Sequence, residues 1–341
     1  MPSLLYGSCP ATTYLMPCLL SAIYDIVLSR QLAAFNITDE QVAQLRDLIV
    51  PRVQKLVASR VPDGASLFAN FKLPAAENAE LGRYVFTPGQ TSVRYPQVSN
   101  ATAFYLSSKE VDSISLQFRR FNLNDPEYAK QLEDVYWFGS LNSTNRSSYD
   151  TGSARYWALG AGTGTVAGLW VNVSISVLPE NTSVIDQARF FKQLGASAWD
   201  AAVTCWRTKY RELFWRPITA IRRFHGLRQA DPNWVPFLST PAHPEYPSGH
   251  QCSVGAAAFI LEQWVGDNVS FSAASQGAPD LGARTYSSFK AAGKEAGDSR
   301  FYAGVHFQKA NVDGFELGYR VARQLHTSVF KERTYSTQKK K

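Results

Sequence analysis

The stretch "SVIDQARFFKQLGASAWDAAVTCWRTKYRELFWRP", residues 183–217, is the longest helical pattern in the chain and decides its fold class. Apolar side chains recur in it at helical spacing up to Pro217, which cannot continue a helix. Helical patterns also cover residues 38–60, 125–139, 249–265, 283–298 and 312–330. We therefore expect a mainly α-helical fold with few or no strands, most simply one large helical bundle.

The rest of the chain adds little to this picture. Residues 66–105 are mixed and rich in turn formers, and "GRYVFTPGQTSVRYP" at 82–96 is the only candidate strand or hairpin. A chain of 341 residues with 45% hydrophobic residues can bury a large core. We expect a single helical domain over residues 1–335, followed by a short basic disordered tail at 336–341.

Charge and hydropathy limit the partners. The formal net charge of +7 favours anionic partners, but the positive residues are diffuse and the longest basic run is Lys339 to Lys341. We therefore expect no nucleic-acid partner. The most apolar stretch, "YLMPCLLSAIYDIVL" at 14–28, is too short for a membrane span and contains Asp25, so no integral span is expected.

Glycosylation sequons indicate the compartment. Composition alone predicts about two of them. The chain has seven, at Asn36, Asn100, Asn142, Asn145, Asn172, Asn181 and Asn268. We expect an N-glycosylated protein of the secretory pathway whose leader is missing from this sequence. The four cysteines, Cys9, Cys18, Cys205 and Cys252, lack metal-ligand spacing, and both disulfides and buried free thiols stay open.

The segment "HPEYPSGH", residues 243–250, places two histidines seven residues apart around a Pro-Ser-Gly turn before a helix. Backbone N–H groups at a helix start lack intrahelical partners and lie at the positive end of the dipole, which suits an oxyanion. The alternative is an ordinary helix start, with Ser248 as the N-cap and His250 in solvent.

Two cations upstream form a second candidate pair. Lys209 and Arg216 are seven residues apart, which is two helical turns, so on one helix they project from one face and can bind one anion. The alternative is that they pair separately with Glu212 or with solvent.

The third candidate pair is Arg300 and His306, six residues apart. On an unbroken helix these side chains diverge by about 120°, so a common ligand requires a bend. Gly304 is the expected position of that bend.

Taken together, Lys-x6-Arg-Pro, Pro-Ser-Gly-His and Ser-Arg-x5-His, in this order, resemble the signature of a known superfamily. It joins type 2 phosphatidic acid phosphatases, bacterial class A acid phosphatases and vanadium-dependent haloperoxidases. The signature region lies within 206–313. "ARYWALGAGTGTVAGLW" at 154–170, "FWRPITAIR" at 214–222 and "DPNW" at 231–234 look like the soluble haloperoxidase-like branch.

The resemblance implies a vanadate cofactor and a set of roles. His306 becomes the axial vanadium ligand, His250 the acid–base histidine, and Lys209 the group that polarises hydrogen peroxide. The oxyanion-binding residues are Lys209, Arg216, Ser248, Gly249 and Arg300. The partners are then hydrogen peroxide, a halide and small organic acceptors, and the sequence leaves room for an oligomer.

The halide pocket and the surroundings of His306 are less regular. His243 matches a histidine of algal bromoperoxidases and Trp206 a tryptophan of chloroperoxidases, so the halide pocket is mixed. Bromide is the expected halide. The alternative is that His243 is a plain loop residue. Superfamily members often carry an acidic residue four positions after the last histidine, where it orients the imidazole. Here that position is Ala310, and Asp313 is the candidate substitute.

Two other functions stay open. One is a secreted acid phosphatase, which hydrolyses phosphate monoesters through a phosphohistidine and needs no vanadate. The other is a non-catalytic descendant that binds an oxyanion. Ala310 motivates this last hypothesis, and the intact signature residues argue against it.

Overall fold

The computed structural model describes residues 37–60, 71–73, 79–223 and 227–330. Backbone contacts divide these residues into two compact units. The first contains α2 (Asp39–Arg60) and residues 160–164, and the second contains all other described elements. The expectation of one domain over 1–335 therefore stays a prediction, and the tail at 336–341 lies outside the described residues.

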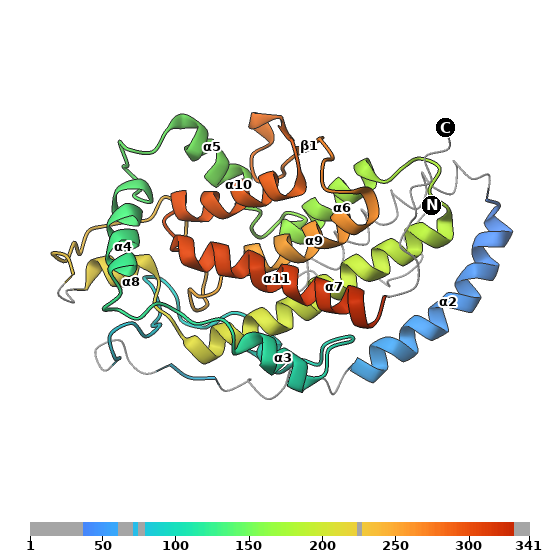
Figure 1. Ribbon diagram of the computed structural model, residues 1–341, viewed down its shortest axis with the longest axis horizontal. Coiled ribbons are helices and arrows are strands. Elements are labelled where there is room, and N and C mark those ends of the chain that lie inside the picture. The colour runs from blue at the N-terminus through green and yellow to red at the C-terminus, as the bar shows by residue number, and fades with distance from the viewer. Residues whose placement is uncertain (1–36, 61–70, 74–78, 224–226, 331–341) are drawn as a thin grey trace. The chain divides into compact units, whose positions relative to one another are not determined.

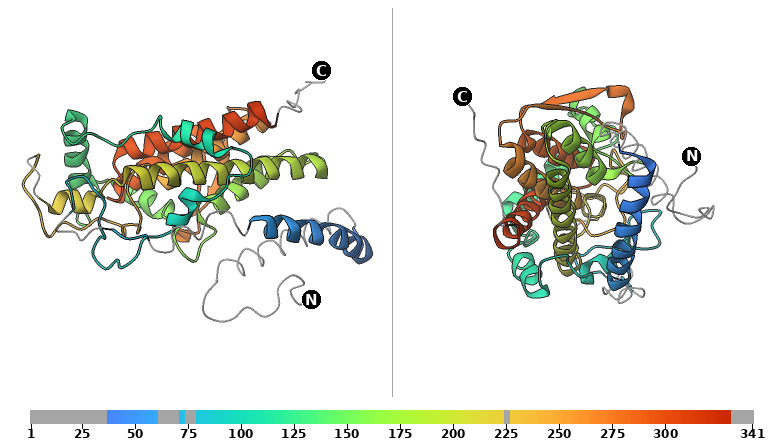
Figure 2. Two further views of the ribbon diagram at one scale, coloured as in Figure 1. Left: turned by 90° about the horizontal axis from the view of Figure 1, so that it is seen from below. Right: turned by 90° about the vertical axis from the view of Figure 1, so that its right-hand side faces the viewer.

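The second unit is built mainly from helices, as the views in Figures 1 and 2 show. Its α-helices are α3 (Ser108–Ser115), α4 (Pro126–Phe138), α5 (Ser148–Tyr156), α6 (Thr165–Val177), α7 (Val184–Glu212), α8 (Pro217–Arg222), α9 (Gly249–Val265), α10 (Phe289–Tyr302) and α11 (Gln308–Ser328). Two short 3₁₀ helices, η3 (Pro96–Asn100) and η4 (Pro279–Leu281), join them. The predicted mainly α-helical fold class is confirmed.

A single antiparallel hairpin is the only sheet among the described residues. It pairs β1 (Phe271–Ala274) with β2 (Ala283–Tyr286). The segment at 82–96, which was only a candidate strand or hairpin, is irregular and forms an isolated bridge from Arg83 to Phe214. The helix predicted from residue 283 begins instead at Phe289, because β2 occupies the first four of those positions.

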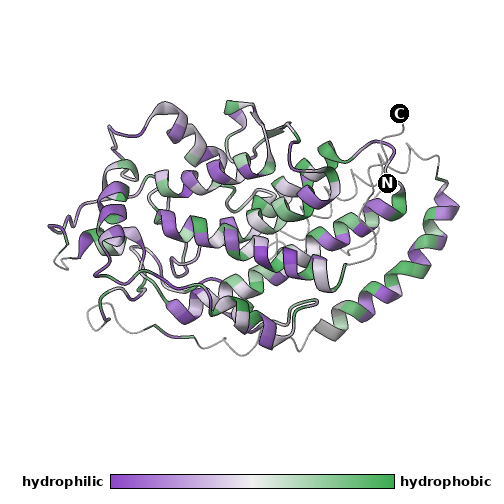
Figure 3. Ribbon diagram, in the orientation of Figure 1, coloured by the Kyte–Doolittle hydropathy of each residue, from purple (hydrophilic) through white to green (hydrophobic). Residues whose placement is uncertain are grey.

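Three long helices, α7, α9 and α11, pack against one another and form the centre of the second unit (Figure 1). Apolar colours dominate α9 in Figure 3, and its sequence contains a single carboxylate, Glu262. Glycines let α9 and α11 approach closely. A Cβ atom on Gly255 would lie 2.0 Å from the carbonyl oxygen of Phe315, and one on Gly318 would lie 1.9 Å from that of Cys252. This close contact fixes the N-terminus of α9 beside the start of α11.

The surface and the cysteines bear on the expected compartment. Among the residues placed by the structure, no helix is long and apolar enough to cross a bilayer. The exposed sequon asparagines are Asn142, Asn145, Asn172, Asn181 and Asn268, while Asn100 is partly exposed. Asn36, Cys9 and Cys18 lie outside the described residues, and Cys205 and Cys252 are buried free thiols.

We predict opposite effects of the same substitution at two helical glycines. Gly318→Ala should destabilise the protein by about 1–3 kcal/mol, because the new methyl group meets backbone of α9. Gly195→Ala, at an exposed site of α7 where a Cβ atom meets nothing within 4 Å, should stabilise it by about 0.5–1 kcal/mol. Urea denaturation of both variants measures the difference, and equal free-energy changes would contradict the close packing of α9 and α11.

Candidate active site

Lys209 and Arg216 do not lie on one helix, because α7 ends between them. Lys209 lies in the last turn, and Leu213, with φ of 44°, ends the helix by donating its N–H to the Lys209 carbonyl at 3.0 Å. Arg216 follows in extended conformation as the N-cap of α8. The prediction that both cations project from one helix face is therefore wrong, and the left-handed turn at Leu213 is the physical reason.

Lys209 nevertheless reaches the segment that precedes α9. Its side chain is fully buried, and its Nζ donates to the carbonyls of Pro244 at 2.9 Å, Glu245 at 3.1 Å and Pro247. The ammonium group is thus held by neutral carbonyl dipoles. Burial lowers the pKa of Lys209 to about 8.

Arg216 binds the same segment from the other side. Its Nε donates to the His243 carbonyl at 2.9 Å and its Nη1 to the Val305 carbonyl at 2.7 Å. Pairing of the two cations with Glu212 does not occur, because the Glu212 carboxylate accepts from Arg119 and Arg211.

The start of α9 does not behave as an ordinary capped helix. Ser248 occupies the N-cap position, but its side chain makes no capping bond, and its buried Oγ has no hydrogen-bond partner. Gly249 follows so close to the indole of Trp206 that a Cβ atom would lie 2.8 Å from the ring. His250 is partly exposed in the first turn, with Nε2 3.3 Å from the carbonyl oxygen of Ala158. Free donors at this terminus suit an oxyanion.

Arg300 and His306, the third candidate pair, are brought together by a turn at Gly304, where the sequence predicted a bend. α10 ends at Tyr302, and Gly304 adopts φ of 73°, a conformation that favours glycine. A Cβ atom there would also lie 2.3 Å from the carbonyl oxygen of Gly139. The turn brings the His306 N–H back to the Arg300 carbonyl, at 3.3 Å. Arg300 is buried, and its Nε and Nη1 have no partner among the described residues.

His306 lies between a cation and a carboxylate. Its Nε2 is 3.1 Å from Arg216 Nη1, and its Nδ1 is 2.9 Å from Glu245 Oε1. The same Oε1 accepts the Phe307 backbone N–H at 3.0 Å. Burial raises the pKa of Glu245 to about 7 against the lowering effect of Arg216.

Glu245 is the residue that sequence reasoning missed. Asp313 does not reach His306, because its carboxylate accepts from the Tyr246 hydroxyl at 2.5 Å and from Lys309 Nζ at 2.7 Å. The expectation for Asp313 is therefore wrong. The available signal was the position of Glu245 inside the motif at 243–250, two residues after its first histidine.

Trp206 and His243, the predicted halide pocket, lie together beside the cations. Their ring centroids are 5.5 Å apart, and Lys209 Nζ is 5.8 Å from the Trp206 ring centroid. His243 Nδ1 is 3.1 Å from Arg216 Nη2, and the buried Trp206 Nε1 has no hydrogen-bond partner. His243 is thus part of the site rather than a plain loop residue.

The site carries an excess of buried positive charge. Lys209, Arg216 and Arg300 are buried around a single buried carboxylate, Glu245. Burial lowers the pKa of both arginines. Removing charges from water without a partner costs several kcal/mol per ion, so this arrangement favours a bound anion.

The histidines respond to the same environment. Burial, reinforced by neighbouring cations, holds the pKa of His243, His250 and His306 below the usual histidine range. All three imidazoles are therefore neutral at pH 7 before an anion binds. A multiply charged anion in their midst would raise their pKa and prepare one of them to take up a proton.

These residues fit a tetrahedral oxyanion such as vanadate. Its oxygens require hydrogen-bond donors, which Ser248 Oγ, Arg300 Nε and Nη1, and the first N–H groups of α9 supply. His306 Nε2 would be the imidazole nitrogen that contacts its central atom. Within the described ranges no group of three His, Cys, Asp or Glu side chains is placed to hold a metal cation, and an oxyanion needs no such group.

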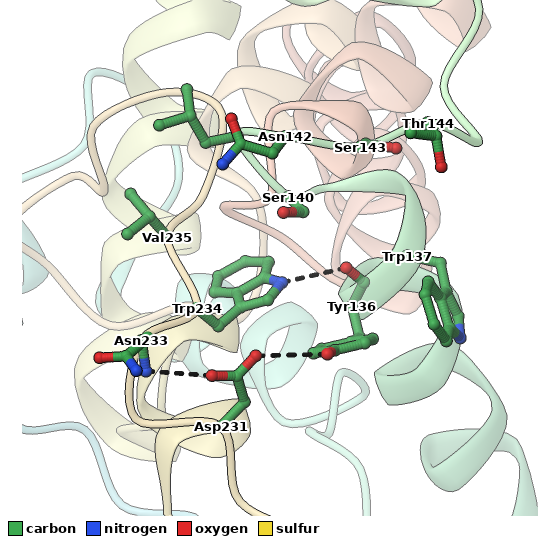
Figure 4. A pocket seen from close by; sticks show the side chains of 11 residues that line it. Tyr136, Trp137, Ser140, Asn142, Ser143, Thr144, Asp231, Asn233, Trp234 and Val235 are labelled. Carbon is green, nitrogen blue, oxygen red and sulfur yellow. Dashed lines mark hydrogen bonds between the residues drawn. The ribbon is translucent and has the colours of Figure 1, made fainter.

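A pocket with a volume of about 270 Å³ lies between the C-terminal end of α4, the loop at 140–144 and the segment at 231–235 (Figure 4). Its polar groups bind one another: the Tyr136 hydroxyl donates to Asp231 at 3.2 Å, and the Trp234 indole N–H donates to the Tyr136 carbonyl at 3.0 Å. None of the predicted site residues lines it. The unpaired donors that suit an oxyanion, on Ser248 and Arg300, do not line this pocket.

Comparison with known proteins agrees with this geometry. Residues 189–333 match the family described as the VCPO second helical-bundle domain. The vanadium chloroperoxidase of Curvularia inaequalis is 28% identical over 152 residues, which are 38% of this chain and 25% of that enzyme. The match thus spans about a quarter of the length of the curated relative.

Solved structures share the fold. A bacterial vanadium-dependent iodoperoxidase superposes with a TM-score of 0.66 and 24% identity, covering 92% of this chain and 73% of that one. An apo-type bacterial vanadium-dependent chloroperoxidase gives a TM-score of 0.59 and 15% identity, covering 86% and 80% of the two chains. The match of residues 189–333 and the Curvularia relative support placing the chain in the superfamily of vanadium-dependent haloperoxidases, and the solved structures agree in fold.

Proposed function

We propose that this protein is a vanadate-dependent haloperoxidase that oxidises bromide with hydrogen peroxide. The balanced reaction is H₂O₂ + Br⁻ + H⁺ → HOBr + H₂O, and small organic acceptors then react with the hypobromous acid. The observation that carries the proposal is the group of unpaired donors, Ser248 Oγ with Arg300 Nε and Nη1, beside a neutral His306 and the Trp206–His243 pair. The Curvularia relative, named as a vanadium chloroperoxidase, supports the same chemistry.

The residues divide the work as follows. Lys209, Arg216 and Arg300 would hold vanadate and neutralise its charge, with Ser248 and Gly249 as further donors and His306 Nε2 as the imidazole ligand. When bound, vanadate supplies Lewis-acid chemistry that activates the peroxide toward halide without a change in oxidation state.

His250 is the proposed base for hydrogen peroxide. A carbonyl oxygen can only accept a hydrogen bond, so the contact with Ala158 assigns the ring proton to Nε2. Nδ1 then carries the free lone pair that takes the peroxide proton. Lys209 would polarise the peroxide through its positive charge alone, because its three N–H donors bind the carbonyls of Pro244, Glu245 and Pro247.

The halide would enter beside Trp206 and His243. His243 Nδ1 lies 3.1 Å from Arg216 Nη2, which can only donate, and 3.3 Å from the Pro244 carbonyl oxygen, which can only accept; the shorter contact favours the tautomer with its proton on Nε2. An imidazole N–H and the unpaired indole N–H of Trp206 are both donors suited to a halide. We propose bromide because His243 matches a histidine of algal bromoperoxidases. The solved neighbours are named for iodide and for chloride, so they do not decide the halide.

A secreted acid phosphatase is the second candidate. The observation in its favour is that the same donors suit phosphate, and His306 Nε2 can attack phosphorus while His250 protonates the leaving oxygen. Vanadate would then act as an inhibitor. The two candidates differ in whether bound vanadate creates activity or abolishes it.

The first experiment separates these functions. Protein purified without phosphate is divided into metal-free and orthovanadate-loaded halves, and each is assayed for peroxide-dependent bromination and for aryl phosphate hydrolysis. We expect bromination only in the loaded half; hydrolysis only in the metal-free half would make the protein a phosphatase.

His306→Ala should reduce either activity at least about 10³-fold, through the loss of the group that contacts the oxyanion. His326→Gln, remote on α11, is the matched control and should leave both unchanged.

Binding of a fixed-charge anion tests the electrostatics. Sulfate keeps its charge between pH 6 and pH 9, and both arginines, whose pKa is lowered to about 10, stay mostly protonated in that range. The pKa of buried Lys209 is lowered to about 8, so its proton is present below pH 8 and lost above it. Sulfate affinity, followed by calorimetry, should therefore fall above pH 8 by up to about tenfold per pH unit, beyond the change near pH 7 that titration of Glu245 causes with or without Lys209. Lys209→Met should bind more weakly at low pH and lose this dependence; an unchanged pH profile in that variant would reject Lys209 as an anion ligand.

We also propose that the protein is N-glycosylated in the secretory pathway, on the basis of five exposed sequon asparagines. Expressed in a eukaryotic host behind a secretion signal, it should lose mass when treated with peptide N-glycosidase. Peptide mapping should place glycans at Asn142 or Asn145, which lie in an exposed loop. Secreted protein of unmodified mass would contradict the proposal.

A further inference from the structure

We propose that Glu245 is a positioning residue that fixes His306 as the neutral tautomer with its proton on Nδ1, so that the Nε2 lone pair faces the oxyanion. The proposal rests on the proposed function only in taking His306 Nε2 as the atom that contacts vanadate or phosphate. Glu245 itself contacts neither.

The first argument comes from the cationic side of His306. Arg216 Nη1 lies 3.1 Å from His306 Nε2. A guanidinium group has only donors, so Nε2 must accept this hydrogen bond and carry no proton. A neutral imidazole then has its proton on Nδ1.

The second argument comes from the opposite side and requires the same tautomer. Glu245 Oε1 accepts the Phe307 N–H at 3.0 Å, so this oxygen acts as an acceptor. It lies 2.9 Å from His306 Nδ1, and an ionised carboxylate can only accept, so Nδ1 is the donor while Glu245 is ionised. Two independent neighbours thus assign one protonation pattern to one buried ring.

Only the carboxylate can maintain this pattern when the anion arrives. Arg216 is one of the residues that would turn its donors toward the oxyanion, and its hydrogen bond to Nε2 must then be given up. The hydrogen bond from Nδ1 to Glu245 lies on the far side of the ring and is unaffected. Carboxylates in this position fix the tautomer and raise the basicity of a ligating histidine.

Glu245 is itself held in place by backbone contacts. Its N–H donates to the Phe214 carbonyl at 2.9 Å, and its carbonyl accepts from Lys209 Nζ at 3.1 Å. The residue is buried, with no freedom to exchange its partners for water. The segment at 243–250 therefore orients Lys209 through its carbonyls and His306 through one side chain.

Two variants separate hydrogen-bond acceptance from charge. Glu245→Gln keeps an acceptor oxygen, which the Phe307 N–H will hold in the position of Oε1. Glu245→Leu has a similar volume and removes the acceptor. Glu262→Leu, at another buried glutamate far along α9, is the matched control for the loss of a buried carboxylate.

The direct measurement is the tautomer of His306 in phosphate-free buffer. Long-range ¹H–¹⁵N correlation spectra of ¹⁵N-histidine-labelled protein distinguish the two ring nitrogens, and His306→Gln assigns the signals. We expect the Nδ1–H tautomer in the unmodified protein, in Glu245→Gln and in Glu262→Leu, and a mixture of tautomers in Glu245→Leu. An Nε2–H tautomer in the unmodified protein, or no change in Glu245→Leu, would overturn the proposal. The tautomer of His306 in the unmodified protein can be measured even if Glu245→Leu does not fold.

Orthovanadate binding supplies the second measurement. Calorimetry should show affinity weakened by about 10- to 100-fold in Glu245→Leu and by less than about threefold in Glu245→Gln and Glu262→Leu. Equal losses in Glu245→Leu and Glu245→Gln would show that charge rather than tautomer matters and would overturn the proposal. If the unmodified protein has the expected tautomer but neither binds vanadate nor brominates, the proposed function fails while the role of Glu245 in fixing the ring stands.

Discussion

Buried positive charge is the constraint on which the rest of this structure depends. Lys209, Arg216 and Arg300 lie inside the helical unit with one carboxylate, Glu245, to oppose them. Such a cluster is tolerable only because carbonyl groups partly solvate it and because an anion can complete it. The carbonyls that bind Lys209 and Arg216 come from the segments around residues 243–247 and 305. The fold is therefore organised around a place for an oxyanion.

The helices serve this site by fixing where their ends lie. Close contact of α9 and α11 at Gly255 and Gly318 holds the N-terminus of α9 beside the segment that carries His306. The turn at Gly304 brings His306 back toward Arg300. Hydrogen-bond donors stabilise the charge that develops in a transition state only if they are in place before the reaction begins. Fixed helix ends meet this requirement.

The sequence predicted the residue types of the site better than their geometry. Periodicity predicted the long helices α7, α9 and α11, each of which buries many apolar side chains. It also predicted the helix at 38–60, but Leu45, Leu48 and Ile49 of that helix are exposed. The motifs predicted which cations and histidines meet, and the spacing of Arg300 and His306 predicted the turn at Gly304. Local spacing was misleading for Arg216, because a left-handed residue ends α7 first. It was also misleading for Asp313, because the partner of His306 comes from Glu245, 61 residues away, and such a contact depends on tertiary packing. Short strands with half-polar faces were missed for the same reason.

The chemistry of the site follows from what occupies it, because the same donors suit phosphate and vanadate. The most direct test of the account is the location of vanadium in crystals soaked with orthovanadate, by anomalous scattering at the vanadium edge. The account predicts one dominant peak beside His306 Nε2, within reach of Lys209, Arg216, Arg300 and Ser248. A peak in the pocket lined by Tyr136 and Trp234, or no peak beside His306 at saturating orthovanadate, would contradict it.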